Sequence, residues 1–300
     1  MNILISSVHP ALFEAQLKVL CKLGHKLFVP TVSNMFGYGQ TYDESISRLP
    51  ETLKPVLHKI DFQTLNSSGI DLVWCSCFDQ LVKARLLAED LKAKLLLYAC
   101  NNNTPYRSTD GDYLLSEDFA TFVNAPIKHK QYVVFPPNKD HFWSNDFLKR
   151  DLTVVTLINR YERYPEHYNF YKQIANTYQN KFTFHWLNNV HDRNEVAHAL
   201  KTAYCLLHLK PEEASGNSMM EALACNTPVV VNEDLLQGRT CGLFLIPGFN
   251  CHTIRMGHVE DFGLVKAVPY GGIAGNLREF TNQAKCQHIV NDFLTKIQRG

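Results

Sequence analysis

Short apolar runs alternate with amphipathic stretches along most of the chain. In the first half, residues 2–7 (NILISS) form an apolar run, and residues 11–24 follow with apolar side chains at helical spacing. Gly24 is well placed to end that helix, and an apolar run at 25–30 completes a strand–helix–strand unit. The same order recurs over residues 71–100. Strands this apolar, separated by helices, predict a parallel sheet covered by helices on both faces.

The pattern restarts after residues 135–146 (FPPNKDHFWSND), whose prolines, Asn and Asp are typical of a linker. The expected strands on either side of it, beyond those above, are 112–117, 131–136, 152–158, 182–187, 203–209, 227–231, 242–247 and 263–268. The expected helices are 166–179, 193–202, 218–225 and 275–297. Apart from the last strand, residues 248–274 show no regular pattern.

These elements predict two doubly wound, Rossmann-like α/β domains, 1–148 and 149–300, that face each other across a cleft. Parallel sheets of this kind bind ligands outside the carboxyl ends of their strands. The segments that directly follow strands are therefore the first places to look for a functional site.

Composition excludes several classes of protein. The formal net charge of the 300-residue chain is +1, so bulk charge favours no nucleic-acid partner. The nine cysteines are scattered, without a CxxC pair or a cluster with His, so we expect free thiols and no metal site. No apolar run is long enough to span a membrane, and no secretory signal opens the chain. We therefore expect a cytoplasmic protein.

The most informative segment is 211–231 (PEEASGNSMMEALACNTPVVV). Glu213 and Glu221 are separated by seven residues, and Gly216 and Asn217 lie where the helix between them begins. The free N–H groups of a helix start favour an anion, and carboxylates accept hydrogen bonds from hydroxyl groups. A sugar joined to a nucleoside through a diphosphate carries hydroxyls on both sides of its phosphates. The segment therefore indicates a nucleotide-sugar site.

This segment resembles the E-x7-E segment of retaining GT-B glycosyltransferases, whose usual form is E-G-F-G-x-x-x-x-E-A-x-A-x-G-x-P-V. The matching residues are Glu213, Gly216, Glu221, Ala222, Ala224, Pro228 and Val229. The departures are Ala214, Ser215 and Asn226. The resemblance implies a GT-B-like fold with an acceptor-side domain at 1–148 and a nucleotide-sugar-binding domain at 149–300.

The resemblance also implies roles for single residues. Glu213 would contact the donor sugar and take part in catalysis, and Glu221 would contact the ribose. The amides of Gly216, Asn217 and Ser218 would contact sugar and phosphate. A structural alternative stays open, because Ser218-x-x-Glu221 also reads as a capping box and Glu213 as a solvated loop acid.

Cations for the diphosphate are expected in two loops. Where the family has G-R-L followed by a lysine, this chain has "LINRYER", so Arg160 takes the place of the arginine and Arg163 is the best substitute for the lysine. Lys210 follows another predicted strand. Charge-assisted bonds to phosphate contribute roughly 1.5–3 kcal/mol each. The alternative is a solvated, charged loop.

The first half offers fewer candidates for the acceptor or sugar side. His9 follows the first strand, and Asn101 stands where the family often carries a histidine near the donor sugar. Asp110-x-Asp112 spells D-x-D, a metal-binding pattern in the other large glycosyltransferase fold. In a doubly wound chain we interpret it as a turn.

The leading hypothesis is a metal-independent, retaining glycosyltransferase of the hexosyltransferase type, with no cofactor. It would move a sugar from a nucleoside-diphosphate sugar to a hydroxyl of a glycan, a lipid or a small molecule. The alternatives are a nucleotide-sugar epimerase or hydrolase of the same fold, and a non-catalytic nucleotide-sugar-binding protein. A dinucleotide oxidoreductase is disfavoured, because no G-x-G-x-x-G follows the first strand. The pattern names neither the base, the sugar, the acceptor, the linkage nor the oligomeric state.

Overall fold

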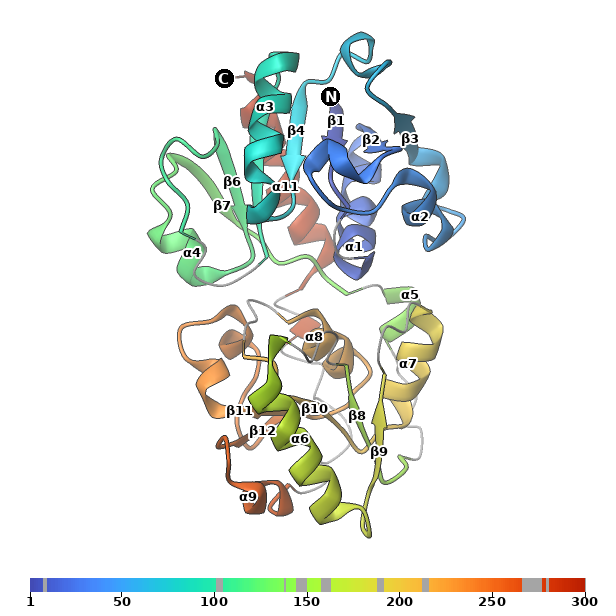
Figure 1. Cartoon of the computed structure of the whole chain (residues 1–300), viewed down its shortest axis with the longest axis vertical. Helices are drawn as coiled ribbons and strands as arrows, with labels where there is room; N and C mark the ends of the chain where they lie inside the picture. The colour runs from blue at the N-terminus through green and yellow to red at the C-terminus, as the bar shows by residue number, and fades with distance from the viewer. Residues whose placement is uncertain are drawn as a thin grey trace. The chain divides into compact units, whose positions relative to one another are not determined.

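The computed structural model describes residues 1–7, 10–100, 105–137, 139–143, 150–157, 163–187, 192–211, 216–265, 277–278 and 281–299. The chain splits into two compact units (Figure 1). The first unit comprises Met1–Pro136 and Thr281–Gly300, and the second comprises Pro137–Phe280. Each unit has one parallel sheet with helices on its faces, so the predicted α/β class is confirmed.

The first unit contains a seven-stranded sheet in the order β3-β2-β1-β4-β5-β6-β7. Its strands are β1 (Asn2–Ile5), β2 (Lys26–Pro30), β3 (Leu57–Ile60), β4 (Leu72–Cys75), β5 (Lys94–Ala99), β6 (Tyr113–Ser116) and β7 (His129–Tyr132). Its helices are α1 (Pro10–Leu20), α2 (Tyr42–Ser47), α3 (Leu81–Leu91), α4 (Phe119–Asn124) and α11 (Gln283–Arg299). Every pair of neighbouring strands is parallel.

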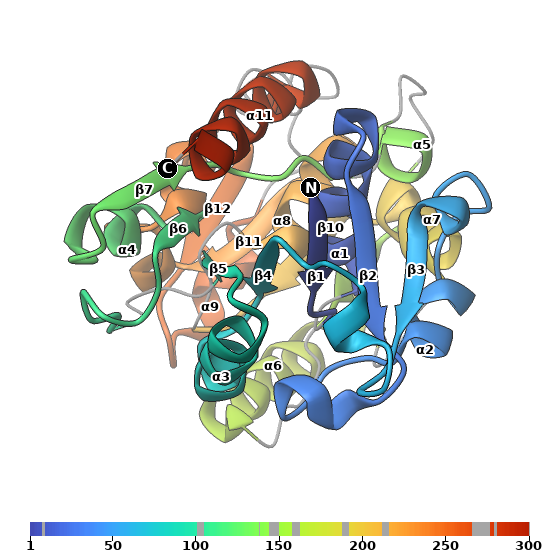
Figure 2. The ribbon, with the colours of Figure 1, turned by 90° about the horizontal axis from the view of Figure 1, so that it is seen from above.

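The apolar strands of this sheet are buried on both faces, as their sequence predicts. In β1, Ile3 and Ile5 belong to one core cluster and Leu4 to the other, and all three are fully buried. The first cluster packs under α1 and α11, and the second packs under α3. Figure 2 shows α3 and α11 on opposite faces of the sheet.

The closing helix α11 belongs to the first unit, which differs from the expected domain of 149–300. Its apolar stripe, which includes Val290, Phe293 and Leu294, is buried in the core cluster under α1. The ring of Phe293 meets that of Tyr113 edge-on, with centroids 6.0 Å apart. Helical periodicity identifies the apolar face of a helix, but it does not tell which sheet that face covers.

The second unit contains a five-stranded sheet in the order β12-β11-β10-β8-β9. Its strands are β8 (Thr153–Thr156), β9 (Thr183–Trp186), β10 (Cys205–His208), β11 (Val229–Asn232) and β12 (Cys251–Ile254). Its helices are α5 (Lys139–Phe142), α6 (Pro165–Tyr178), α7 (Arg193–Thr202), α8 (Asn217–Ala224) and α9 (Val259–Gly263). All strand pairs are again parallel.

Three of the expected strands differ from the structure. Residues 242–247 form no strand. Thr240–Leu243 is a short 3-10 helix, and Phe244 and Leu245 belong to the loop that follows and bury their side chains in the core. The run expected at 131–136 contains only the end of β7. Of the run 263–268, residues 263–265 close α9 and its turn, and the remaining residues lie outside the described part. Apolar content alone therefore does not make a strand.

Two strands, β3 and β12, were not expected. Both carry polar residues, such as His58 and Lys59 in β3 and His252 and Thr253 in β12. Both lie at the edge of a sheet, where one side of the strand stays open to polar surroundings. All nine cysteines are free thiols, as predicted. Among the described residues, no helix is long and apolar enough to cross a membrane.

Candidate functional site in the second unit

The topology of the second sheet creates one place suited to a ligand. β9 lies next to β8 on one side of the sheet, whereas β10 and β11 follow one another on the other side of β8. Right-handed crossovers therefore place α6 and α8 on opposite faces of the sheet. The carboxyl ends of β8 and β10 lie side by side, with Leu206 paired to Val155. In doubly wound sheets, this switch point is where ligands bind.

Both segments singled out in the sequence follow these two strands. Arg160 comes after β8 and Glu213 comes after β10 in the sequence, and both strands end at the switch point. The two residues themselves lie outside the described residues, as do His9 and Asn101 of the first unit. Their roles therefore stay predictions.

The start of α8 has the geometry that the sequence indicates. Gly216 is its N-cap residue, with φ 65°, and its carbonyl accepts hydrogen bonds from Met219 (2.9 Å) and Met220 (3.1 Å). A side chain at Gly216 would be strained by this φ and would also collide with the Met219 methyl group. The first N–H groups of a helix have no partner within it, so those of Asn217 and Ser218 lie at an end that favours an anion.

The capping-box interpretation of Glu221 is wrong. The N-cap is Gly216, and no side chain caps the helix, so Ser218 is already the second helical residue. The hydroxyl of Ser218 instead lies 3.2 Å from Nδ1 of His208, the buried last residue of β10. This contact fixes the helix start to the end of the strand. From the sequence, His208 was expected in a strand and was given no functional role.

Glu221 is buried and forms an ion pair with Arg193, the first residue of α7. Its side chain is 6% exposed and that of Arg193 is 16% exposed. The guanidinium of Arg193 also lies over the ring of Phe142 in α5, 4.8 Å from its centroid. A buried carboxylate needs such a partner, because an uncompensated charge in an apolar interior is strongly unfavourable. Arg193 thus holds Glu221 in place and joins α5, α7 and α8.

The role of Arg193 was not predicted from the sequence. Its place at the start of the helix that follows β9 could have indicated a functional residue, since α7 starts at the same edge of the sheet as α8. Its Nε is buried and has no hydrogen-bond partner among the described residues. At the other end of α8, burial raises the pKa of the Cys225 thiol to about 12, so this group stays protonated and donates to the Phe142 carbonyl at 3.3 Å.

Three further cations lie at this edge. Lys210 is half-buried two residues after β10, where the sequence predicts it. Arg163 is exposed and lies just before α6, and it makes no ion pair within the described part of the chain. Arg239, which was not among the residues predicted from the sequence, donates from Nη1 to the carbonyl of Pro211, three residues after β10. These side chains supply positive charge at the edge where the anion is expected.

The D-x-D sequence of the first unit has structural roles, as predicted. The carboxylate of Asp112 accepts a hydrogen bond from the Leu95 amide at 2.9 Å. Asp110 accepts one from Nη2 of Arg85 at 3.0 Å and another from the Arg107 amide at 2.6 Å. Among the described residues, no group of three or more His, Cys, Asp and Glu side chains could hold a metal ion.

Comparison with known proteins identifies the fold. No protein-family model and no curated protein sequence matches the chain. The solved structure of Anabaena HepE in complex with UDP aligns with a TM-score of 0.63 and 10% identity, covering 99% of this chain and 100% of HepE. HepE is also known in complex with UDP-glucose, and with UDP and glucose.

Two other glycosyltransferases align over nearly their whole length. The lipopolysaccharide outer core galactosyltransferase WaaB aligns with a TM-score of 0.56 and 11% identity, covering 99% of each chain. Sucrose-phosphate synthase of Thermosynechococcus elongatus aligns with a TM-score of 0.55 and 12% identity, covering 100% of this chain and 94% of the enzyme. The chain therefore has the GT-B fold of glycosyltransferases, as its sequence predicts.

Proposed function

We propose that this protein is a retaining glycosyltransferase that uses a nucleoside-diphosphate sugar, with a UDP-sugar as the first donor to test. The observation that carries the proposal is the position of the E-x7-E segment. It follows β10, at the switch point of a sheet whose fold is that of glycosyltransferases, and it begins α8 with a glycine N-cap. Structures of HepE contain UDP and UDP-glucose, which makes these ligands the natural probes.

The proposed ligand lies along the carboxyl edge of the second sheet. Its diphosphate would meet the first amides of α8, with Arg160, Arg163 and Lys210 as candidate cations. Its ribose would meet Glu221, which Arg193 orients from α7. Glu213 would lie beside the donor sugar. A vicinal diol can donate two hydrogen bonds to one carboxylate, which suits the ribose.

In the proposed reaction, the bond between the anomeric carbon and the diphosphate oxygen breaks while the acceptor oxygen bonds to the same face of the sugar. The leaving phosphate takes the acceptor proton, so the step needs no strong protein base. The protein would contribute mainly by positioning the reactants and by stabilising the charge that develops on the diphosphate. Glu213 would stabilise positive charge at the anomeric carbon. A metal ion is not part of this proposal.

The proposal is tested by following radiolabelled UDP-glucose and UDP-galactose with a mixed pool of glycan, lipid and small-molecule acceptors, in EDTA. The expected result is acceptor-dependent transfer with retention of the anomeric configuration. Conversion of the donor at the same rate without acceptor would favour an epimerase or hydrolase of the same fold. Tight UDP binding without any conversion would favour a binding protein. Activity that EDTA abolishes and Mn²⁺ restores would overturn metal independence.

The phosphate part of the site is tested with Arg160→Ala. The variant should bind UDP about 1.5–3 kcal/mol more weakly. Uridine, which has no phosphates, should bind almost as it does to the parent. Equal weakening of both ligands in calorimetry would mean that Arg160 acts through the fold and not through the diphosphate.

A further inference from the structure

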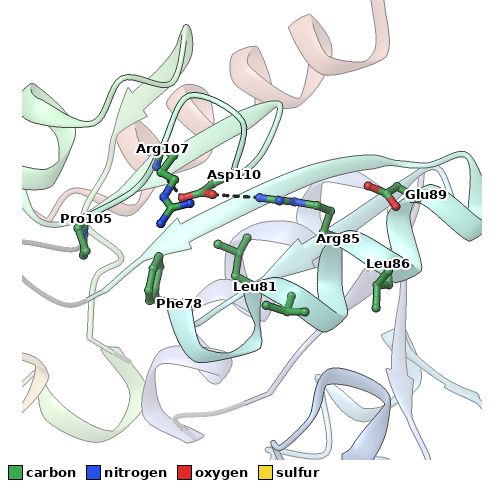
Figure 3. Close-up of a pocket in the computed structure, with 9 residues that line it drawn as sticks. Phe78, Leu81, Arg85, Leu86, Glu89, Pro105, Arg107 and Asp110 are labelled. Atoms are coloured by element: carbon green, nitrogen blue, oxygen red, sulfur yellow. Dashed lines mark hydrogen bonds and ion pairs between the residues drawn. The ribbon is translucent and has the colours of Figure 1, made fainter.

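A second candidate site lies in the first unit, beside Asp110 of the D-x-D sequence. A pocket of about 690 Å³ separates α3 from the loop that precedes β6 (Figure 3). Its α3 wall includes Leu81, Val82 and Leu86, and Pro105 and Arg107 contribute from the loop. Pockets of 300–1,000 Å³ are typical of small-molecule sites.

One end of the pocket reaches the edge of the sheet where ligands bind. Phe78 lies three residues after the end of β4, and Pro105 lies in the connection from β5 to β6. Both strands end at the same edge, because β4 and β5 are parallel neighbours. From this edge the pocket follows α3 toward Glu89.

Hydrogen bonds fix the wall opposite α3. Asp110 pairs with Arg85 on the helix and accepts from the Arg107 amide, and its own N–H donates to the Arg107 carbonyl at 3.0 Å. The buried ring of Tyr106 meets that of Phe78 edge-on, with centroids 5.4 Å apart. The pocket is therefore held open between two anchored walls and does not depend on a loosely packed loop.

The apolar side chains of this pocket are unusually exposed. Val82 is 72% exposed, Leu86 is 50% exposed and Phe78 is 36% exposed. Val82 and Leu86 are four residues apart and form a stripe along α3, and Phe78 lies in the short 3-10 turn that precedes this helix. Their exposure is the reverse of what folding favours, and covering them with an apolar group would be favourable.

The charges around the pocket are uneven. Arg85 compensates the nearly buried carboxylate of Asp110. The guanidinium of Arg107 takes part in no ion pair among the described residues, and Figure 3 shows it directed toward Phe78. Glu89 lies at the opposite end. An anionic group is thus favoured next to Phe78, and an apolar body is favoured along Val82 and Leu86.

We propose that this pocket binds a small amphiphilic anion, a molecule with an apolar body of roughly ten carbon atoms and one carboxylate or phosphate group. The anion pairs with Arg107, and the apolar body covers Phe78, Val82 and Leu86. The ligand binds as a single molecule and not as part of a membrane surface. The exposed acids Glu89 and Asp90 beside the apolar stripe would be repelled by anionic lipid headgroups.

The test is calorimetric titration of the full chain with decyl phosphate and decanoate below their micelle concentrations. Both probes should bind at one site. Val82→Glu and Leu86→Glu should each weaken binding at least about tenfold, because they place a negative charge on the apolar stripe. The matched control is Val123→Glu on α4, which also changes an exposed valine of the first unit but lies outside the pocket. It should bind like the parent.

The role of Arg107 is tested separately with Arg107→Gln and the uncharged amphiphile octyl β-glucoside. The variant should lose affinity for decyl phosphate about tenfold and keep its affinity for the uncharged probe. Equal binding of decyl phosphate to the parent, Val82→Glu and Val123→Glu would overturn the proposal. So would binding to anionic vesicles alone, or a dimer that Val82→Glu dissociates. UDP affinity, measured in the same samples, reports on the proposed transfer independently.

Discussion

The two candidate sites lie at the carboxyl edges of two similar parallel sheets, but they differ in what they bury and what they expose. At α8, a carboxylate is buried, and Arg193 on a neighbouring helix compensates it. At α3, the apolar side chains of Val82 and Leu86 are 72% and 50% exposed. A buried charge must be compensated within the fold, because an unpaired one would destabilise the protein. Exposed apolar side chains destabilise the fold little, so they can stay exposed until a ligand binds.

This difference predicts that changes at the α8 site affect stability as well as binding, whereas changes at the exposed side chains Val82 and Leu86 of the α3 pocket affect binding alone. Four substitutions test it, beginning with the largest expected effect.

Arg193→Met should destabilise the second unit by about 3 kcal/mol, because it leaves the buried Glu221 without its partner. Hydrogen exchange measured by mass spectrometry should show the loss in α7 and α8, and denaturant unfolding should give its size. Arg255→Gln is the control, since it breaks an ion pair between the exposed Arg255 and Asp261 in the same unit. If both variants lose equal protection, Arg193 does not hold α7 against α8.

Glu221→Gln should weaken UDP binding by about 1.5–3 kcal/mol, which is roughly ten- to more than hundredfold. Glutamine can still accept a hydrogen bond from Arg193, so the fold should suffer less than in Arg193→Met. Calorimetry with 2′,3′-dideoxyuridine diphosphate separates the two possible roles of this carboxylate. The substitution should leave binding of this analogue nearly unchanged, because it lacks the hydroxyls. An equal loss for both ligands would make Glu221 a structural partner of Arg193 only.

Gly216→Ala should reduce UDP affinity up to about fivefold, the equivalent of about 1 kcal/mol, because it distorts the helix start that faces the phosphates. Gly238→Ala is a matched control, since Gly238 has φ 67° and open space around it, whereas Gly216 has φ 65° and faces Met219. Both variants carry the conformational strain of a positive φ. Only Gly216→Ala should bind UDP more weakly while binding uridine normally. Identical UDP affinities would show that the start of α8 contributes nothing to phosphate binding.

Val82→Glu should change the free energy of unfolding by no more than about 0.5 kcal/mol, because the side chain is already exposed. Its neighbour Leu81, which is 7% exposed and belongs to the core under α3, provides the contrast. Leu81→Glu should prevent stable folding of the first unit. If denaturant curves show that Val82→Glu is as damaging as Leu81→Glu, the stripe on α3 is part of the core and not a binding surface.

Much of the fold could be predicted because many helices and strands have a recognisable pattern of neighbouring residues. Buried parallel strands such as β1 and β10 are short apolar runs, and amphipathic helices such as α6 and α7 have their own period. The strand expected at 242–247 was wrong because an apolar loop that buries Phe244 has the same composition as a strand. Edge strands such as β12 were missed because they keep polar residues.

For the candidate site, the sequence by itself determined which segments follow strands, where α8 begins and that Glu221 lies within it. These are local facts, since glycine, spacing and apolar period are properties of neighbouring residues. Only the tertiary structure decided that Arg193 pairs with Glu221, that Ser218 binds His208 and that α11 covers the first sheet. Each of these contacts joins elements that are separate in the chain. The reason is physical. A buried charged or apolar side chain requires a contact partner, but only the packing of the helices on the sheets determines which residue that partner is.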